Sequence, residues 1–155
     1  WVSYKYCNGS YNTLTKYNTG LDGYGGTIDN KLTLDLEDDT ARAKMGGDWK
    51  MPTHALMEEL VKETTSEWVT NYNGTDVNGR KFTSKKDTSK YIFIPASGER
   101  HDSLSYAQGN QGIVWSSSLE SSNPGKAWNL NVDAAHIGAD SELSRSYGFV
   151  VRGVL

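Results

Sequence analysis

The sequence predicts an α+β domain in which two helices pack on a small, twisted antiparallel sheet and loops make up much of the chain. Three observations favour this class. Start and stop signals bound two helical stretches, near residues 35–46 and 53–64. Apolar and polar residues alternate strictly from 128 to 133, as in a half-buried strand. The chain has 16 glycines but 3 prolines, and Gly, Asn, Asp and Ser separate its short apolar runs.

Composition limits what the chain can be. With 155 residues it predicts one domain, 1–155. The 5 Trp, 9 Tyr and 3 Phe are core material that a disordered chain lacks. A net charge of -3 excludes a strongly basic nucleic-acid footprint. No apolar run approaches about 18 residues, so we expect no membrane span. Cys7 is the single cysteine, which excludes an intrachain disulfide and a cysteine-built zinc site.

The first predicted helix begins after Thr33 or Asp35, because either side chain can cap a helix. The acidic residues at 37–39 suit the positive N-terminal end of this helix, and basic residues fall in its last turn. The pair Gly46-Gly47 ends it. The acidic residues are also possible calcium ligands, but they lack the alternating ligand positions and central Gly of an EF-hand. We therefore favour the helix-dipole interpretation.

The second predicted helix begins at Pro52 and Thr53, which are typical of the first positions of a helix. Leu56, Leu60 and Val61 follow at helical spacing. Beyond this helix, Asn-Gly pairs at 73–74 and 78–79 indicate hairpin turns. Residues 91–95 predict a short buried strand, residues 96–111 a long polar loop, and three apolar runs follow at 112–116, 127–132 and 147–155.

The alternating strand predicts which side chains reach solvent. Trp128, Leu130 and Val132 share one face, so Asn129, Asn131 and Asp133 are expected to point outward. Arg152 interrupts an apolar run, and we expect it to form a buried or half-buried ion pair or hydrogen bond. The predicted core consists of Trp49, Phe93, Trp115, Trp128, Leu130, Phe149 and Val151.

No motif for catalysis or metal binding is present. His54, His101 and His136 are scattered, and no Gly-x-Ser-x-Gly elbow or His-Glu-x-x-His motif occurs. The glycine-rich stretch 23–26 lacks the Lys and Ser/Thr of a phosphate-binding loop. We therefore expect a non-enzymatic protein with no cofactor and no metal site. An enzyme would require a convergent set of titratable groups in a cleft.

Several motifs together, in order along most of the chain, resemble one family. That family is the Fibrobacter succinogenes major paralogous domain, found in secreted and lipid-anchored proteins of gut Bacteroidetes. The helix entry at 49–53 also resembles that of formylglycine-generating-enzyme-like C-type lectin folds. The matching stretches are residues 35–42 (DLEDDTAR), 49–53 (WKMPT), 93–100 (FIPASGER), 114–119 (VWSSSL), 127–130 (AWNL) and 148–154 (GFVVRGV).

The resemblance implies a C-type lectin-like fold and a surface-displayed ligand-binding module that is extracellular or at the cell surface, including as part of a lipid-anchored protein. Some family members are variable proteins of diversity-generating retroelements, in which a C-terminal stretch is rewritten to form a binding face. The calcium and sugar motifs of true C-type lectins are missing, as is the cysteine pair of formylglycine-generating enzymes, so neither activity is carried over.

The stretch 133–141 lacks helical or strand periodicity, which is typical of a tolerant display loop. We therefore expect a variable ligand-binding region at 120–147, with Tyr147 and His136 contributing most to binding. The expected partner is a protein or glycan at a cell or phage surface, bound by a monomer or weak oligomer. The alternative is a structural or adhesive subunit of a surface fibre or pilus. The predicted binding residues are Ser122, Asn123, Asn129, Asn131, Asp133, Ala135, His136, Ile137, Ala139, Asp140, Glu142, Ser144 and Tyr147.

Overall fold

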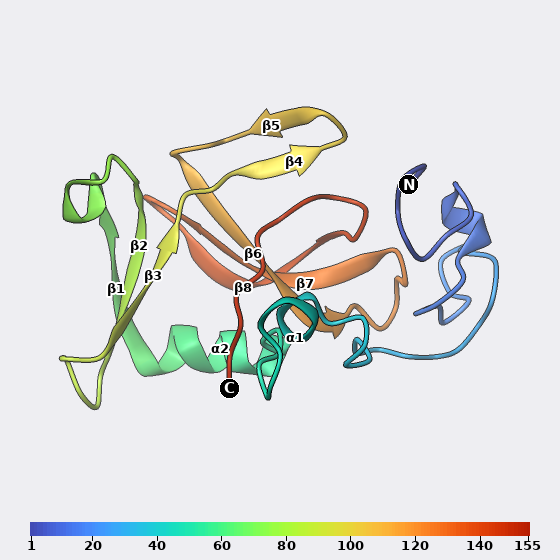
Figure 1. Cartoon of the computed structure of the whole chain (residues 1–155), viewed down its shortest axis with the longest axis horizontal. Helices are drawn as coiled ribbons and strands as arrows, with labels where there is room; N and C mark the ends of the chain where they lie inside the picture. Colours follow the sequence, from blue (N-terminus) through green and yellow to red (C-terminus); the bar gives the residue numbers. More distant parts are fainter.

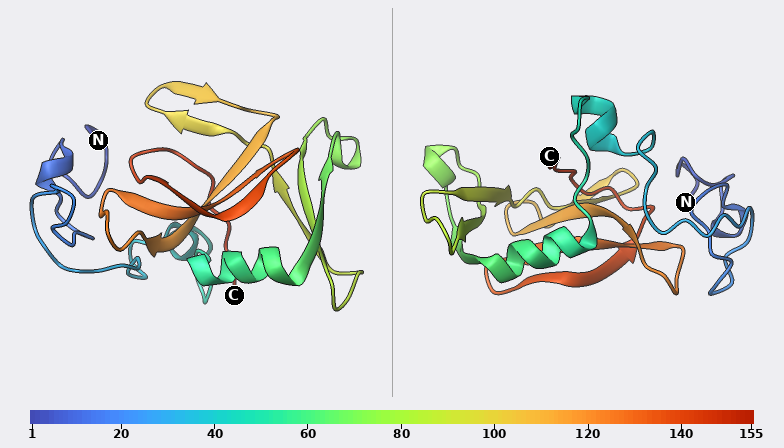
Figure 2. Two further views of the ribbon diagram at one scale, coloured as in Figure 1. Left: turned by 180° about the vertical axis from the view of Figure 1, so that it is seen from behind. Right: turned by 90° about the horizontal axis from the view of Figure 1, so that it is seen from below.

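The computed structural model describes all 155 residues and contains three antiparallel sheets arranged along an elongated body (Figure 1). The sheet β6–β8 lies in the middle, the sheet β1–β3 at one end and the N-terminal coil at the other (Figure 2). The strands are β1 (Thr64–Val69), β2 (Gly79–Ser84), β3 (Tyr91–Pro95), β4 (Glu99–His101), β5 (Leu104–Tyr106), β6 (Gln111–Leu119), β7 (Lys126–Asp133) and β8 (Ile137–Ser144). The helices are α1 (Thr40–Met45) and α2 (His54–Glu63), with 3-10 turns η1 (Tyr11–Thr13) and η2 (Tyr72–Gly74).

The predicted fold class, an α+β domain with two helices packed on one sheet, is wrong. The chain is mostly β-structure, and α2 is the one substantial helix. The chain before α1 is held against strand β6 instead of coiling, because the Leu34 amide donates to the Ser117 carbonyl at 2.9 Å. The cap of α1 is Asp39, whose side chain accepts from the Arg42 amide. The prediction of a C-type lectin-like fold with two helices packed on one sheet is wrong for the same reason.

The second helix is confirmed. The Thr53 hydroxyl accepts from the Leu56 amide at 3.3 Å, as its capping role predicts. Met57 is the buried residue of α2, and Leu60 and Val61 pack beside it. The helix thereby covers the main core, where buried apolar side chains of two sheets meet. This core consists of Met57, Phe82, Ile94, Val114, Leu130, Val132 and Ala139.

The strands at 91–95, 112–116 and 127–132 are confirmed as β3, β6 and β7. Residues 96–111, predicted as a loop, instead contain the hairpin of β4 and β5. The apolar run 147–155 forms no continuous strand. It touches the body through isolated bridges, from Val150 to Val114 and from Val154 to Lys50.

The expected exposure of Asn129 is wrong, because β7 is the central strand of its sheet and both of its faces are covered. The pairing of β7 with β8 shifts between Asn129 and Asn131. The extra residue of this irregularity lies on β8, so β7 keeps its alternation. Asn129 is 0% exposed and its neighbour Leu130, on the opposite face, is 2% exposed. Both faces of this central strand are covered: Leu130 joins the main core, while Ala127 packs with Tyr17 in a second, smaller cluster.

The aromatic members of the predicted core lie at its margin. Of the seven predicted residues, only Leu130 is fully buried, and the other six are half-buried. Four of them pack on rings instead: Trp128 stacks on His54 and Phe93 on Tyr72, while Trp115 and Phe149 contact each other at a tilt.

The predicted burial of Arg152 is wrong, because this side chain is exposed, but its guanidinium does donate a hydrogen bond to the Phe93 carbonyl at 3.4 Å. The buried arginine is Arg145, which is 7% exposed and follows β8. Its surroundings could not be read from the local sequence, since its partners lie far away along the chain.

We expect Asn129→Ala to destabilise the protein by about 1–3 kcal/mol, because the Asn129 amide donates to the Ser141 carbonyl at 3.0 Å in a buried position. His136→Ala and Asp140→Ala are expected to change stability by about 0.5 kcal/mol or less, since both residues are exposed. Urea unfolding measures all three. Equal effects of the three substitutions would contradict the burial of Asn129.

Candidate functional site

The predicted ligand-binding residues do not form one patch. Ser122 and Asn123 lie in the turn between β6 and β7, whereas Asp133 and His136 lie at the other end of β7. An eight-residue strand is roughly 25 Å long, so the two groups are well separated. Tyr147 occupies a third place, against the β4–β5 hairpin.

The expected display loop at 133–141 is for the most part strand β8. Only residues 134–136 are fully exposed together, in a turn closed by Asp133, whose carboxylate accepts from the amides of Ala135 and His136, both at 2.7 Å. These two hydrogen bonds lower the pKa of Asp133. Ile137 is half-buried, and Ala139 is 5% exposed and belongs to the main core. The expectation that this stretch is free of packing constraints is therefore wrong for Ala139.

Most of the other predicted binding residues hold the structure together. The amide of Gln111 donates to Asn131 at 2.9 Å, and Lys126 pairs with Glu142 at 3.4 Å. The hydroxyls of Ser144 and Ser146 lie 2.9 Å apart. Asn123 donates to Asp22 in the N-terminal coil and accepts from the Gly125 amide, while Asp140 remains exposed.

Tyr147 belongs to a group of rings that we call the aromatic platform, defined as His101, Tyr106 and Tyr147. The rings of His101 and Tyr147 stack with centroids 3.8 Å apart and planes 26° apart. Tyr106, on β5, has its ring centroid 5.2 Å from that of His101 and is 44% exposed. Glu99 lies 3.2 Å from the His101 ring nitrogen Nε2. The platform thus combines aromatic surface with a carboxylate at its edge.

Backbone pairing fixes the platform to the body. Arg100 and Gly148 exchange two backbone hydrogen bonds, both 2.8 Å long, which dock the β4–β5 hairpin on the C-terminal segment. The indole of Trp115 in β6 donates to the Tyr147 carbonyl at 3.4 Å. The sequence identified Tyr147 but missed His101 and Tyr106. Glu99 and His101, two residues apart, would lie on the same face of a strand, which was the available signal. Both residues fell within the stretch predicted as a loop.

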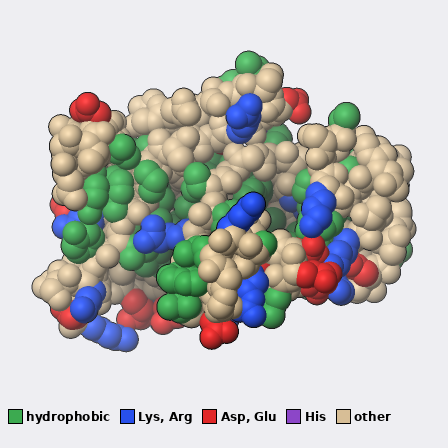
Figure 3. All heavy atoms as spheres, viewed as in Figure 1, with side chains coloured by type: hydrophobic (Ala, Val, Ile, Leu, Met, Phe, Trp, Pro, Cys, Tyr) green, Lys and Arg blue, Asp and Glu red, His purple; other side chains and the backbone are tan.

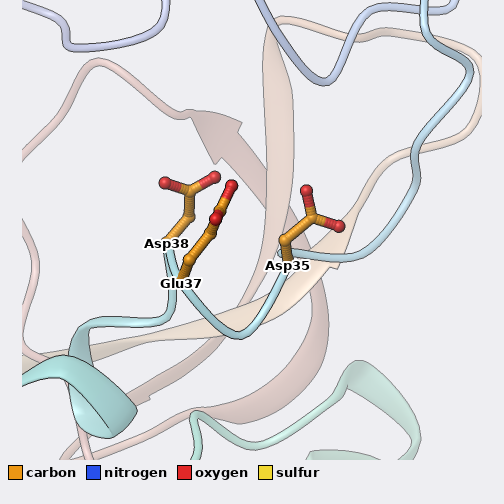
Figure 4. Close-up of side chains that lie close together, drawn as sticks. All are labelled: Asp35, Glu37 and Asp38. Atoms are coloured by element: carbon orange, nitrogen blue, oxygen red, sulfur yellow. The ribbon is translucent and has the colours of Figure 1, made fainter.

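The acidic residues at 35–38 surround a lysine. Lys16 Nζ lies 2.5 Å from Asp38, 2.7 Å from Asp35 and 2.9 Å from Glu37. The three carboxylates rise from one loop (Figure 4), on the side of the molecule where charged side chains of both signs gather near the N-terminal coil (Figure 3). The ammonium group of Lys16 occupies the place that a metal ion would take among these oxygens.

The surroundings of Asp38 shift its titration. Burial acts to raise the pKa of Asp38, but hydrogen bonds from the two lysines and two tyrosines around it outweigh burial and hold the pKa well below its usual range. Hydrogen bonds from Lys16 and Lys31 likewise lower the pKa of Asp35. The same contacts raise the pKa of Lys16, so the network is ionised at neutral pH.

The three histidines form no histidine–serine or histidine–cysteine pair of the kind used in nucleophilic catalysis. None of the rings of His54, His101 and His136 forms a hydrogen bond with a serine hydroxyl or with the thiol of Cys7. The expectation of a non-enzymatic protein remains a prediction.

Comparisons of the chain with protein-family models, with curated proteins and with solved structures found no match. The resemblance carried by the short motifs therefore stays a prediction. No helix of the structure has the length and apolar character needed to cross a membrane.

We expect the protein to lose stability as the pH falls below about 5, because the unfolded state binds protons near the ordinary Asp pKa of about 3.9 while folded Asp38 and Asp35 stay ionised. Above this range their contribution is fully present. Urea unfolding between pH 3 and 6 measures the slope, which should be smaller in Asp38→Asn than in the wild type.

Asp48→Asn is the matched control for this slope, since the Asp48 side chain is 98% exposed. It should follow the wild-type pH dependence. If Asp38→Asn and Asp48→Asn have the same slope, the Lys16 network does not contribute to acid stability.

Proposed function

We propose that the chain is a surface-displayed ligand-binding module and that the aromatic platform holds a saccharide. The observation that supports this proposal is the stack of His101 on Tyr147, with the exposed ring of Tyr106 beside it and Glu99 at the edge. Rings fixed in this way present an apolar surface at little entropic cost on binding.

The chemistry of the platform suits a sugar ring. The C–H bonds on one face of a pyranose are weakly positive, and the face of an aromatic ring is negative, so the two attract each other. The hydroxyl groups of the sugar need polar partners at the rim. Glu99 supplies an acceptor, Arg100 is exposed and supplies donors, and the Tyr106 hydroxyl supplies both.

Charge disfavours a nucleic acid at this position. Stacked aromatic rings also bind bases, but such sites accompany a positively charged groove. Here Glu99 lies 3.2 Å from His101, and the whole chain carries a net charge of -3. A neutral ligand meets no such repulsion.

We also propose that residues of this module vary in the manner of diversity-generating retroelements, but only at exposed positions. Residues 134–136 and Asp140 are exposed and are the positions where replacement leaves the core unchanged. Ala139 and Asn129 are removed from this set because they are buried. A template copy in the flanking DNA that differs at adenines should therefore spare the codons of these two residues.

Calorimetric titration with hexasaccharides of glucose, mannose, xylose and galactose tests saccharide binding. We expect at least one of them to bind and the affinity to fall about tenfold in Tyr147→Ala and in Tyr106→Ala, on the order of 1.4 kcal/mol for each lost ring contact. Tyr91→Ala is the control, because Tyr91 is 50% exposed on β3, outside the platform.

Decaproline serves as the competing probe, since aromatic surfaces also bind proline-rich peptides. Two results would contradict the proposal. One is the absence of binding by all four saccharides. The other is decaproline binding that is lost in Tyr106→Ala, which would assign the platform to a peptide.

A further inference from the structure

A second concave site lies where the N-terminal coil and α1 meet strands β6 and β7, and we call it the sheet cavity. Its volume is about 380 Å³, within the range of small-molecule pockets. None of the three platform residues lines it. Its lining combines charged residues with apolar side chains, which include Leu34, Met51, Trp115, Leu119, Ala127 and Val151.

The carboxylates around the sheet cavity are already neutralised. Asp38 pairs with Lys5 at 3.1 Å and with Lys16 at 2.5 Å, and Glu37 pairs with Lys16 at 2.9 Å. These are the acidic residues of the lining. A cationic ligand would therefore have to displace a lysine from each of them.

Two cations of the lining, in contrast, have no acidic partner. Lys44, in the last turn of α1, forms no ion pair, and neither does Arg145. Arg145 is the more informative of the two because it is 7% exposed. A charge that is buried without a counter-ion is costly, and an anion nearby would offset that cost.

The hydrogen bonds of Arg145 supply partial compensation only. Its guanidinium donates to the carbonyls of Tyr17 and Pro124, both at 2.6 Å, to the Lys16 carbonyl at 3.0 Å, and to the Tyr4 hydroxyl at 2.9 Å. These four bonds use four of the five N–H groups of an arginine. The guanidinium also lies over the rings of Tyr4 and Tyr17, 5.2 and 6.0 Å from their centroids. All these partners are neutral, so no counter-ion balances the positive charge beside the cavity.

We propose that the sheet cavity binds an amphipathic organic anion, with its apolar body against Trp115 and Met51 and its carboxylate or sulfonate toward Arg145 and Lys44. This site is separate from the aromatic platform and does not depend on saccharide binding. The apolar lining gives the affinity, and the unbalanced cations select an anion over a neutral molecule of the same shape.

A pair of fluorescent probes tests the selectivity. 8-Anilinonaphthalene-1-sulfonate carries one negative charge, and N-phenyl-1-naphthylamine is its neutral counterpart. With the folded protein, shown by an intact near-ultraviolet circular dichroism spectrum, we expect one equivalent of the sulfonate to bind at least fivefold more tightly than the neutral probe. Dodecanoate and naphthalene-2-carboxylate, as competitors, distinguish an alkyl from an aromatic acid.

Substitutions at the exposed rim locate the site without disturbing the core. Ala43→Phe places a ring in the cavity mouth and should abolish stoichiometric binding, because Ala43 is exposed and lines the cavity. Lys44→Glu should weaken sulfonate binding about fivefold at low salt, with little effect on the neutral probe. Lys90→Glu, an exposed charge reversal outside the lining, is the matched control, and Tyr106→Ala should bind the sulfonate normally.

Equal affinity for the two probes would overturn the proposal, as would unchanged sulfonate binding in Ala43→Phe or an equal effect of Lys44→Glu and Lys90→Glu. Loss of sulfonate binding in Tyr106→Ala would assign the anion to the platform and would also contradict it. Saccharide binding by Ala43→Phe is measured in parallel, so that a failure of the cavity and a failure of the platform are distinguished.

Discussion

The buried guanidinium of Arg145 joins parts of the chain that no sheet connects. It follows β8 in the sequence, yet it binds the carbonyls of Lys16 and Tyr17 and the hydroxyl of Tyr4 in the N-terminal coil. It also binds the Pro124 carbonyl in the turn between β6 and β7. The N-terminal coil has little regular structure of its own, so these contacts position it over the central sheet.

Both candidate binding sites follow from this arrangement. The sheet cavity exists because the coil stands against β6, and its positive character exists because Arg145 meets carbonyls instead of a carboxylate. The aromatic platform has a different support. It depends on the backbone pairing of Arg100 with Gly148, so a change in the coil should leave the platform in place.

Local signals in the sequence predicted α2, β3, β6 and the position of β7, because capping and alternation act over a few residues. They failed where distant contacts decide. Packing on the second face of β7 buried Asn129, pairing with β7 turned an unpatterned stretch into β8, and pairing of Leu34 with Ser117 shortened the first helix. The platform escaped prediction for the same reason, since its rings come from two separate segments that meet only in the fold.

Amide hydrogen exchange in Arg145→Lys tests the role of this side chain most directly. A lysine offers three donors on a flexible stem and cannot replace four fixed hydrogen bonds. We predict that the amides of Tyr17 and Asn18, which donate to Asp29, lose at least about tenfold of their protection, on the order of 1.4 kcal/mol, while the amides of β7 keep theirs. Unchanged protection of Tyr17 and Asn18 would contradict it.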